Sequence, residues 1–328
     1  MSGSASMTRR SCLLLGLSLP LTGLAQAPFP SRPMRIISPF LPGGANDVLS
    51  RLLANGMSPN LGQPVIVENK PGAGGIIGVE YVTKSPPDGY TMLMTTSSMI
   101  TSYLGLYRSL PYDPRKDLRM ISDVAYFRFI LAVNPSVPAK DVRELIALMK
   151  AHPNKYALGS WGNGTPPHQL QAFLAQKYGA SAVHVPYKGD APLNSDVMAG
   201  NIHIAFGSSA SLIPLVASGR MRALGVSGSP RLKSAPAIPT FGEQGYDEPA
   251  FANPGPFSLM LAAGTPDAIV DQLGSEVRKA LSLPAIRTRI EELGATVVGN
   301  TPEEATAAYK AYLPVAVKLA RDTGVTLD

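Results

Sequence analysis

Apolar runs of strand length alternate with helical patterns along nearly the whole chain, and this order constrains the fold more than any other feature. Strand-like runs occupy residues 35–38, 64–68, 90–95, 129–133, 156–159, 182–185, 202–206 and 222–226. Helical patterns, with apolar residues three and four positions apart, occupy residues 142–152, 169–178, 212–218, 267–283 and 303–322. Such an order predicts α/β domains with mainly parallel sheets covered by helices on both faces. Ligands of these sheets bind beyond the carboxyl ends of the strands.

The first 27 residues have the three parts of a secretory signal. Arg9 and Arg10 precede an apolar core at 13–21, and small residues at 24–27 form a cleavage site. The core is too short to span a bilayer. We therefore expect residues 1–27 to be a cleaved signal peptide and the mature protein to be periplasmic. The twin arginines also fit twin-arginine export, so that route and the general secretory (Sec) route stay open, as do Met1 and Met7 as the start.

Composition excludes several classes of function. The only cysteine, Cys12, lies before the apolar core, so the processed chain has no thiol or disulfide chemistry. The formal net charge is +6, two units of which come from Arg9 and Arg10, and no Lys/Arg run resembles a nucleic-acid patch. The chain has no G-x-S-x-G, H-E-x-x-H or P-loop motif, and its four histidines are dispersed. We expect no enzymatic activity, no metal, no cofactor and no nucleic-acid partner.

The length, about 300 residues after processing, suggests two domains. Two segments could cross between them, residues 129–135 and the Pro/Gly-rich return at 253–261. If the chain crosses twice, domain 1 is discontinuous and consists of residues 28–128 plus 257–328. Domain 2 then consists of residues 129–256.

Four polar loops follow predicted strands, and the first has the clearest chemistry. It turns on Gly43 and Gly44 and opens a helix capped near Asn46 or Asp47. The first N–H groups of a helix lack backbone partners and lie at its positive end, so they can hold a small anion. A plain turn with a helix cap explains the same residues. Residues 43–46 are called the anion site below.

The other three loops are more ambiguous. The loop at 69–78 fails the G-x-G-x-x-G pattern, because Ile77 occupies the third glycine position, and reads as a tight turn. The hydroxyls at 95–98 could cap a helix or bind a ligand oxygen. The loop at 160–168 contains the only tryptophan, Trp161, which could face a ligand or be structural. His168 in this loop reads as a packed or surface residue.

Together the motifs resemble the Bug family, the extracytoplasmic solute receptors of tripartite tricarboxylate transporters. The resemblance rests on the sequences at 39–44, 61–75, 87–91, 110–114, 133–136, 162–168, 184–189, 224–227 and 263–266, in order along the chain. It implies a type II periplasmic-binding-protein fold, in which two α/β domains joined by two crossing segments close on a ligand. It also implies a monomer that captures a small mono- or dicarboxylate and delivers it to membrane subunits of the transporter. The implied ligand residues are Phe40, Pro42, Gly43, Gly44, Ala45, Asn46, Asp47, Thr95, Thr96, Ser97, Trp161, Gly162, Asn163, Gly164, Thr165, Tyr187, Lys188, Gly207 and Ser208.

Three departures from the family pattern bear on the ligand. Ala45-Asn46 stand where relatives often have Ser or Thr, Gly207 stands where they often have Asp, and Trp161 stands at a position that is usually small. With Asp47 as the nearest acid, we expect weak binding of amino acids, because a buried ammonium needs an acidic partner. The ring of Trp161 would suit an aromatic acid. An exported hydrolase of small esters and a ligand-sensing partner of a membrane signalling receptor remain alternatives.

Overall fold

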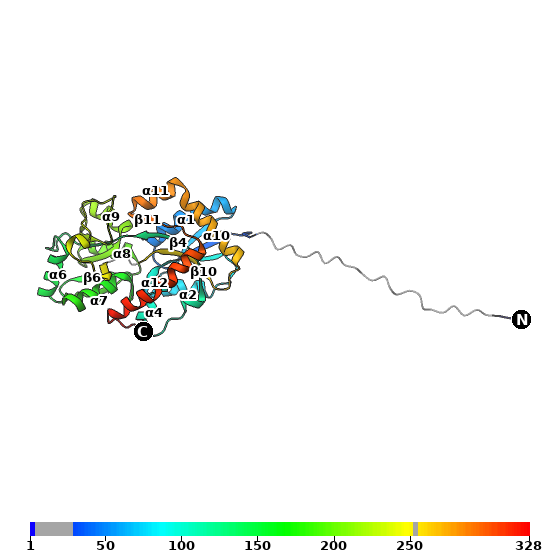
Figure 1. The fold of residues 1–328 in the computed structure, drawn as a ribbon, viewed down its shortest axis with the longest axis horizontal. Helices are drawn as coiled ribbons and strands as arrows, with labels where there is room; N and C mark the ends of the chain where they lie inside the picture. The colour runs from blue at the N-terminus through cyan, green and yellow to red at the C-terminus, as the bar shows by residue number, and fades with distance from the viewer. Residues whose placement is uncertain (4–28, 252–254) are drawn as a thin grey trace.

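The computed structural model describes residues 1–3, 29–251 and 255–328, so nearly all of the predicted signal peptide lies outside it. The strands form two separate sheets (Figure 1). The six-stranded sheet has the order β11-β4-β10-β3-β1-β2 and contains β1 (Met34–Ser38), β2 (Val65–Asn69), β3 (Thr91–Thr96), β4 (Leu118–Phe127), β10 (Phe257–Ala262) and β11 (Ala295–Val297). The five-stranded sheet has the order β7-β6-β8-β5-β9 and contains β5 (Phe129–Val133), β6 (Ala157–Ser160), β7 (Val183–Pro186), β8 (Ile204–Ser208) and β9 (Arg222–Val226).

Helices cover both sheets. We call the six-stranded sheet with its helices the first lobe and the five-stranded sheet with its helices the second lobe. The helices of the first lobe are α1 (Ala45–Leu61), η1 (Ala73–Gly75), α2 (Ile76–Thr83), α3 (Ser97–Ile100), α4 (Tyr103–Leu106), α5 (Pro114–Asp117), α10 (Asp267–Ser282), α11 (Pro284–Glu292) and α12 (Pro302–Asp322). Those of the second are α6 (Val142–Ala151), α7 (Pro166–Tyr178), α8 (Asp190–Ala199), α9 (Ser209–Ala217), η2 (Gly242–Gln244) and η3 (Pro249–Phe251). Helix α1 packs on β1, β2 and α10, and α12 packs on β4 and α4.

Both sheets are mixed, so the prediction of mainly parallel sheets is wrong. β1 pairs in parallel with β2 and β3, but β10 is antiparallel to β3 and β4, and β11 is antiparallel to β4. In the other sheet β6 is parallel to β7 and β8, whereas β5 is antiparallel to β8 and β9. The reason lies in β4, β5 and β10, which border the passages between sheets. They are not joined to their neighbours by a β-α-β crossover, so nothing makes them parallel.

The chain changes sheets through a single residue, Arg128, which separates β4 from β5. Its guanidinium donates hydrogen bonds to the carbonyls of Ser227 and Pro230, in the second lobe. The chain returns to the first sheet at β10. The exact division into residues 28–128 plus 257–328 and 129–256 stays a prediction.

Local sequence explains most elements. In α6 the predicted face of Val142, Leu145, Ile146 and Met149 is buried, and the Asp141 side chain caps the helix by accepting from the Glu144 N–H at 2.7 Å. Thr301 and Glu304 form a capping box at the start of α12. Strand β1 is buried at four of its five positions, because the sheet is covered on both faces.

Candidate functional site

Helix α1 begins at the anion site, and its N-cap lies two residues before Asn46, the first of the two expected caps. Gly44 is its N-cap, with an extended backbone and no capping side chain. Asp47, predicted to face a ligand or to cap the helix, accepts hydrogen bonds from the Gly43 N–H at 3.1 Å, from Arg51 at 2.9 Å and from Asn69 at 3.0 Å. Burial alone would raise the pKa of Asp47, but the bonds from Arg51, Asn69 and Gly43 outweigh it and lower the pKa. Asp47 therefore fixes the turn rather than lining the space beside it.

Loops from the two lobes meet in front of α1. The Leu41 N–H donates to the Lys188 carbonyl at 3.0 Å, and Tyr107 Oη donates to the Asn163 carbonyl at 3.1 Å. Gly74 and Gly162 touch through their backbones, since a Cβ atom on Gly162 would lie 2.8 Å from Gly74 Cα. Gly162 also has a φ of +123°, so a side chain there would be strained as well as blocked. The predicted loops at 40–47, 161–165 and 187–188 thus form one interlobe crevice.

Trp161 lies at the centre of this crevice and is only 4 % exposed. Its ring packs edge-on against Phe40 and Phe129, with centroid distances of 6.1 and 5.4 Å. Its indole Nε1 donates a hydrogen bond of 2.8 Å to Asp190 Oδ1. Trp161 is therefore part of the crevice wall and is held by a specific polar contact.

Asp190 is the residue that sequence reasoning missed, and it overturns the premise that Asp47 is the nearest acid. It is the first residue of α8, is 7 % exposed, and reaches across to the anion site. Ser211 Oγ donates to Oδ1 at 3.2 Å, and the Ala45 N–H donates to the same carboxylate. A Cβ atom on Gly44 would lie 2.7 Å from Oδ2. Burial raises the pKa of Asp190 to about 6, although its hydrogen bonds pull the other way.

Little room remains beside these groups. A space of about 10 Å³ is lined by Phe40, Gly44, Ala45, Asn46, Thr96, Trp161, Gly189, Asp190 and Phe257. Asn46 Nδ2 donates to the Met94 carbonyl at 3.0 Å, and its buried Oδ1 has no partner among the described residues. A larger space of about 360 Å³ adjoins on the side of Gly72, Tyr107, Asn163, Tyr187 and Lys188.

Several predicted residues lie outside both spaces. Thr95 Oγ1 donates to the Thr96 carbonyl, and Thr165 Oγ1 donates to the Gly162 carbonyl at 2.6 Å. Gly207 lies against the Asp190 carboxylate, since a Cβ atom on Gly207 would be 3.3 Å from Asp190 Oδ1. Ser208 Oγ donates to Ser211 Oγ at 3.3 Å. Pro42 is exposed, and Gly164 packs on Tyr103 and Tyr107.

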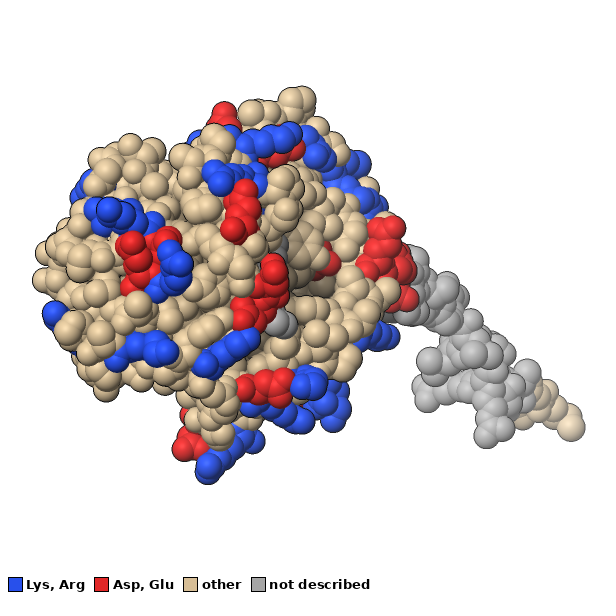
Figure 2. Space-filling view, turned by 60° about the vertical axis from the view of Figure 1, so that its left-hand side comes forward, with Lys and Arg blue, Asp and Glu red and all other residues tan. Residues whose placement is uncertain are grey.

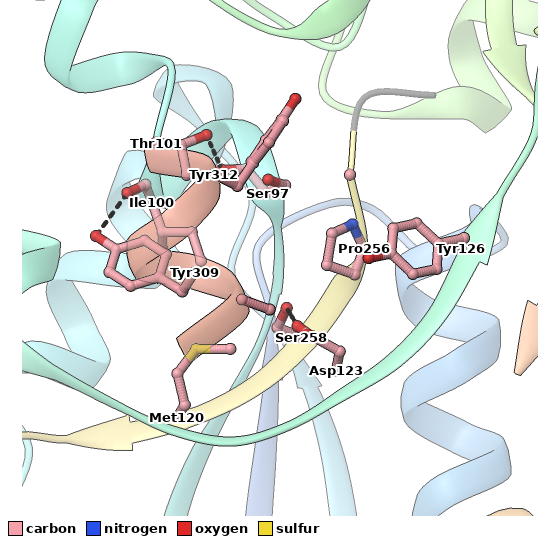
Figure 3. A pocket seen from close by; sticks show the side chains of 12 residues that line it. Ser97, Ile100, Thr101, Met120, Asp123, Tyr126, Pro256, Ser258, Tyr309 and Tyr312 are labelled. Carbon is pink, nitrogen blue, oxygen red and sulfur yellow. Dashed lines mark hydrogen bonds between the residues drawn. The ribbon is translucent and has the colours of Figure 1, made fainter. Parts of the chain in front are cut away.

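Ser97 lines a different pocket, of about 170 Å³, inside the first lobe (Figure 3). Its buried acid, Asp123, accepts from Ser258 Oγ at 2.6 Å and from Asn300 Nδ2 at 3.0 Å. Burial raises the pKa of Asp123. A further space of about 680 Å³ lies between α7 and α12 and is bordered by Ser98 and Phe206.

Basic and acidic side chains are intermingled on the face shown in Figure 2 and do not gather into one patch. In the described ranges, no helix combines the length and hydrophobicity that crossing a bilayer needs. No three His, Cys, Asp or Glu side chains in that part of the chain come together as a metal site would require.

Comparison with known proteins places the chain. Residues 49–308 match the family model described as the tripartite tricarboxylate transporter family receptor. The protein BugT of Bordetella pertussis is 33% identical over 97% of this chain and 98% of its own length. The structure of the periplasmic binding protein BugD is 30% identical, with a TM-score of 0.86, over 91% of this chain and 99% of that one. The structure of Rpa4515 from R. palustris with adipate is 29% identical, with a TM-score of 0.85, over 91% and 99% of the two chains.

The expected family and the two-domain periplasmic-binding-protein fold are thus confirmed. The match to a receptor family also removes the exported hydrolase as an alternative. The chain belongs to the tripartite tricarboxylate transporter receptor family of periplasmic solute-binding proteins, which are receptors and not enzymes.

Proposed function

We propose that this protein captures a small mono- or dicarboxylate, including aromatic acids, by closure of its two domains. It then delivers the solute, as a monomer, to the membrane subunits of a tripartite tricarboxylate-type transporter. The ligand-binding residues are those of the crevice loops, with Phe40, the anion site, Thr96, Trp161–Asn163, Tyr187 and Lys188 contributing most. Residues 1–27 serve as a cleaved export signal.

One observation carries most of the weight: the anion site has a carboxylate beside it, that of Asp190. The first turn of α1, the indole N–H and a hydroxyl thus form a set of neutral donors suited to a carboxylate. The relative that was solved with adipate supports the same ligand class.

The test is calorimetry with the processed protein at neutral pH. We expect adipate, succinate or the aromatic diacid terephthalate to bind, and adipamide, which has the length of adipate without its charge, not to bind. Ligand at a free concentration of about 100 times Kd should also stabilise the native state by about 2.7 kcal/mol in thermal unfolding. Equal binding of adipate and adipamide, or no binding of any acid, would overturn the proposal.

A further inference from the structure

The carboxylate of Asp190 occupies the position at which a ligand carboxylate is expected. Asp190 belongs to α8 of the second lobe, yet its carboxylate accepts from the Ala45 N–H at the start of α1 in the first lobe. Trp161 Nε1 and Ser211 Oγ supply two more donors, at 2.8 and 3.2 Å. Asp190 therefore joins the two lobes through the anion site itself.

The surroundings of Asp190 select an anion rather than a cation. All three contacts are donors, and the positive end of the α1 dipole faces the carboxylate. Among the described residues, no Lys, Arg or His pairs with Asp190, so its charge is balanced by neutral donors alone. A ligand ammonium placed here would face the same N–H groups and the same dipole. The site is built for a negative group, and in this structure the protein supplies that group.

A second carboxylate does not fit beside the first. The space at the anion site is about 10 Å³, close to the minimum that a single water molecule needs. Two carboxylates at such short distance in a buried crevice would also repel each other strongly. A solute carboxylate must therefore take the position of Asp190 or bind away from α1.

We propose that Asp190 is a built-in competitor of the ligand carboxylate and so sets the affinity and selectivity of the receptor. This inference rests on the proposed function. In the ligand-free protein Asp190 bridges the two lobes across the anion site, and it leaves this site when a solute carboxylate enters and the lobes close on the solute. Only protein molecules in which Asp190 has left the anion site can bind the solute. The apparent Kd therefore equals the intrinsic Kd divided by the fraction of molecules in that state. Burial disfavours the ionised form of Asp190 and so lowers the free-energy cost of its leaving the anion site.

The first experiment needs no ligand and uses the fluorescence of Trp161. Asp190→Ala removes the competitor, Ser211→Ala removes one of its donors, and Asp271→Ala is a control that removes a charge from the exposed side of α10. We expect the emission of ligand-free Asp190→Ala to shift to the red, because the crevice opens and water reaches the indole. Ser211→Ala should shift less, and Asp271→Ala should match the wild type. An Asp190→Ala spectrum identical to the wild type would overturn the proposal.

The second experiment measures adipate and aspartate binding to the same four proteins by calorimetry. We expect Asp190→Ala to bind adipate about tenfold more tightly, as when one molecule in ten has a vacated site, and Ser211→Ala to show a smaller gain. Weaker adipate binding by Asp190→Ala would overturn the proposal. So would aspartate binding that this variant loses, because Asp190 would then be a ligand contact. If adipate, succinate and terephthalate bind none of the four proteins, the proposed function fails, and an emission shift in Asp190→Ala would still show that Asp190 holds the crevice.

Discussion

Asp190 is an acid that folding buries without a counter-ion among the residues that the structure describes. Since its folded pKa is about 6 and its reference value is 3.8, the folded state keeps a proton that the unfolded state has already lost between these pH values. The free energy of unfolding should therefore fall as pH rises from about 4 to 6, by up to about 3 kcal/mol, and then level off.

The comparison with Asp190→Asn isolates this effect, because all other titrating groups are shared. Urea unfolding at several pH values should show the variant gaining stability over the wild type as pH rises to about 6. Two curves that stay parallel from pH 4 to 7 would show that Asp190 titrates as an ordinary exposed carboxyl.

The sequence identified some residues of the crevice but not others. Trp161 could be singled out because a large ring in a glycine loop is unusual. Asp190 could not, because an acid in the first turn of a helix is an ordinary dipole partner, here just after Gly189. Its reach to Ala45 depends on how the two lobes face each other, which no local pattern encodes.

Helix α1 offers a test of the anion site that leaves the helix intact. Ala45 is the first helical residue, where proline is favoured, and Gly44 has the extended backbone that a residue before proline prefers. Ala45→Pro therefore removes one N–H with little expected change in stability. In the Asp190→Ala background it should weaken adipate binding by about 1.5–3 kcal/mol, the worth of a hydrogen bond to a charged group.

In the presence of Asp190, Ala45→Pro should reduce the adipate binding free energy by a smaller amount. The reason is that Asp190, which competes with adipate, loses the same N–H donor. Calorimetry on the four proteins of this double-mutant cycle gives the coupling directly. An equal loss in both backgrounds would mean that Asp190 and adipate do not share this donor.

The existence of most helices and strands was predictable, since their apolar periodicity is set by burial on one or both faces. The direction of β10 and the pairing of β4 were not, because they depend on the two passages between sheets. The loops of the crevice could be named from their motifs, whereas the contact of Asp47 with Asn69 could not, because it depends on how α1 packs against β2.

The assembled molecule should be a processed monomer in the periplasm. The expected mature chain begins near Pro28, and intact-mass analysis of periplasmic extract should find no protein that retains residues 1–27. Light scattering of the purified protein should give the mass of one chain. Retention of the signal, or a stable dimer at micromolar concentration, would contradict the respective prediction.

The single residue between β4 and β5 makes the receptor tunable from outside its crevice. In a connection this short, few backbone dihedral angles can change when one lobe rotates against the other. The hydrogen bonds from Arg128 to the carbonyls of Ser227 and Pro230 restrain the connection further. Lengthening it with a few glycines would give the separated lobes more conformational freedom, which closure would then have to remove. A graded series of such insertions would form a set of carboxylate sensors with progressively weaker affinity and an unaltered binding surface.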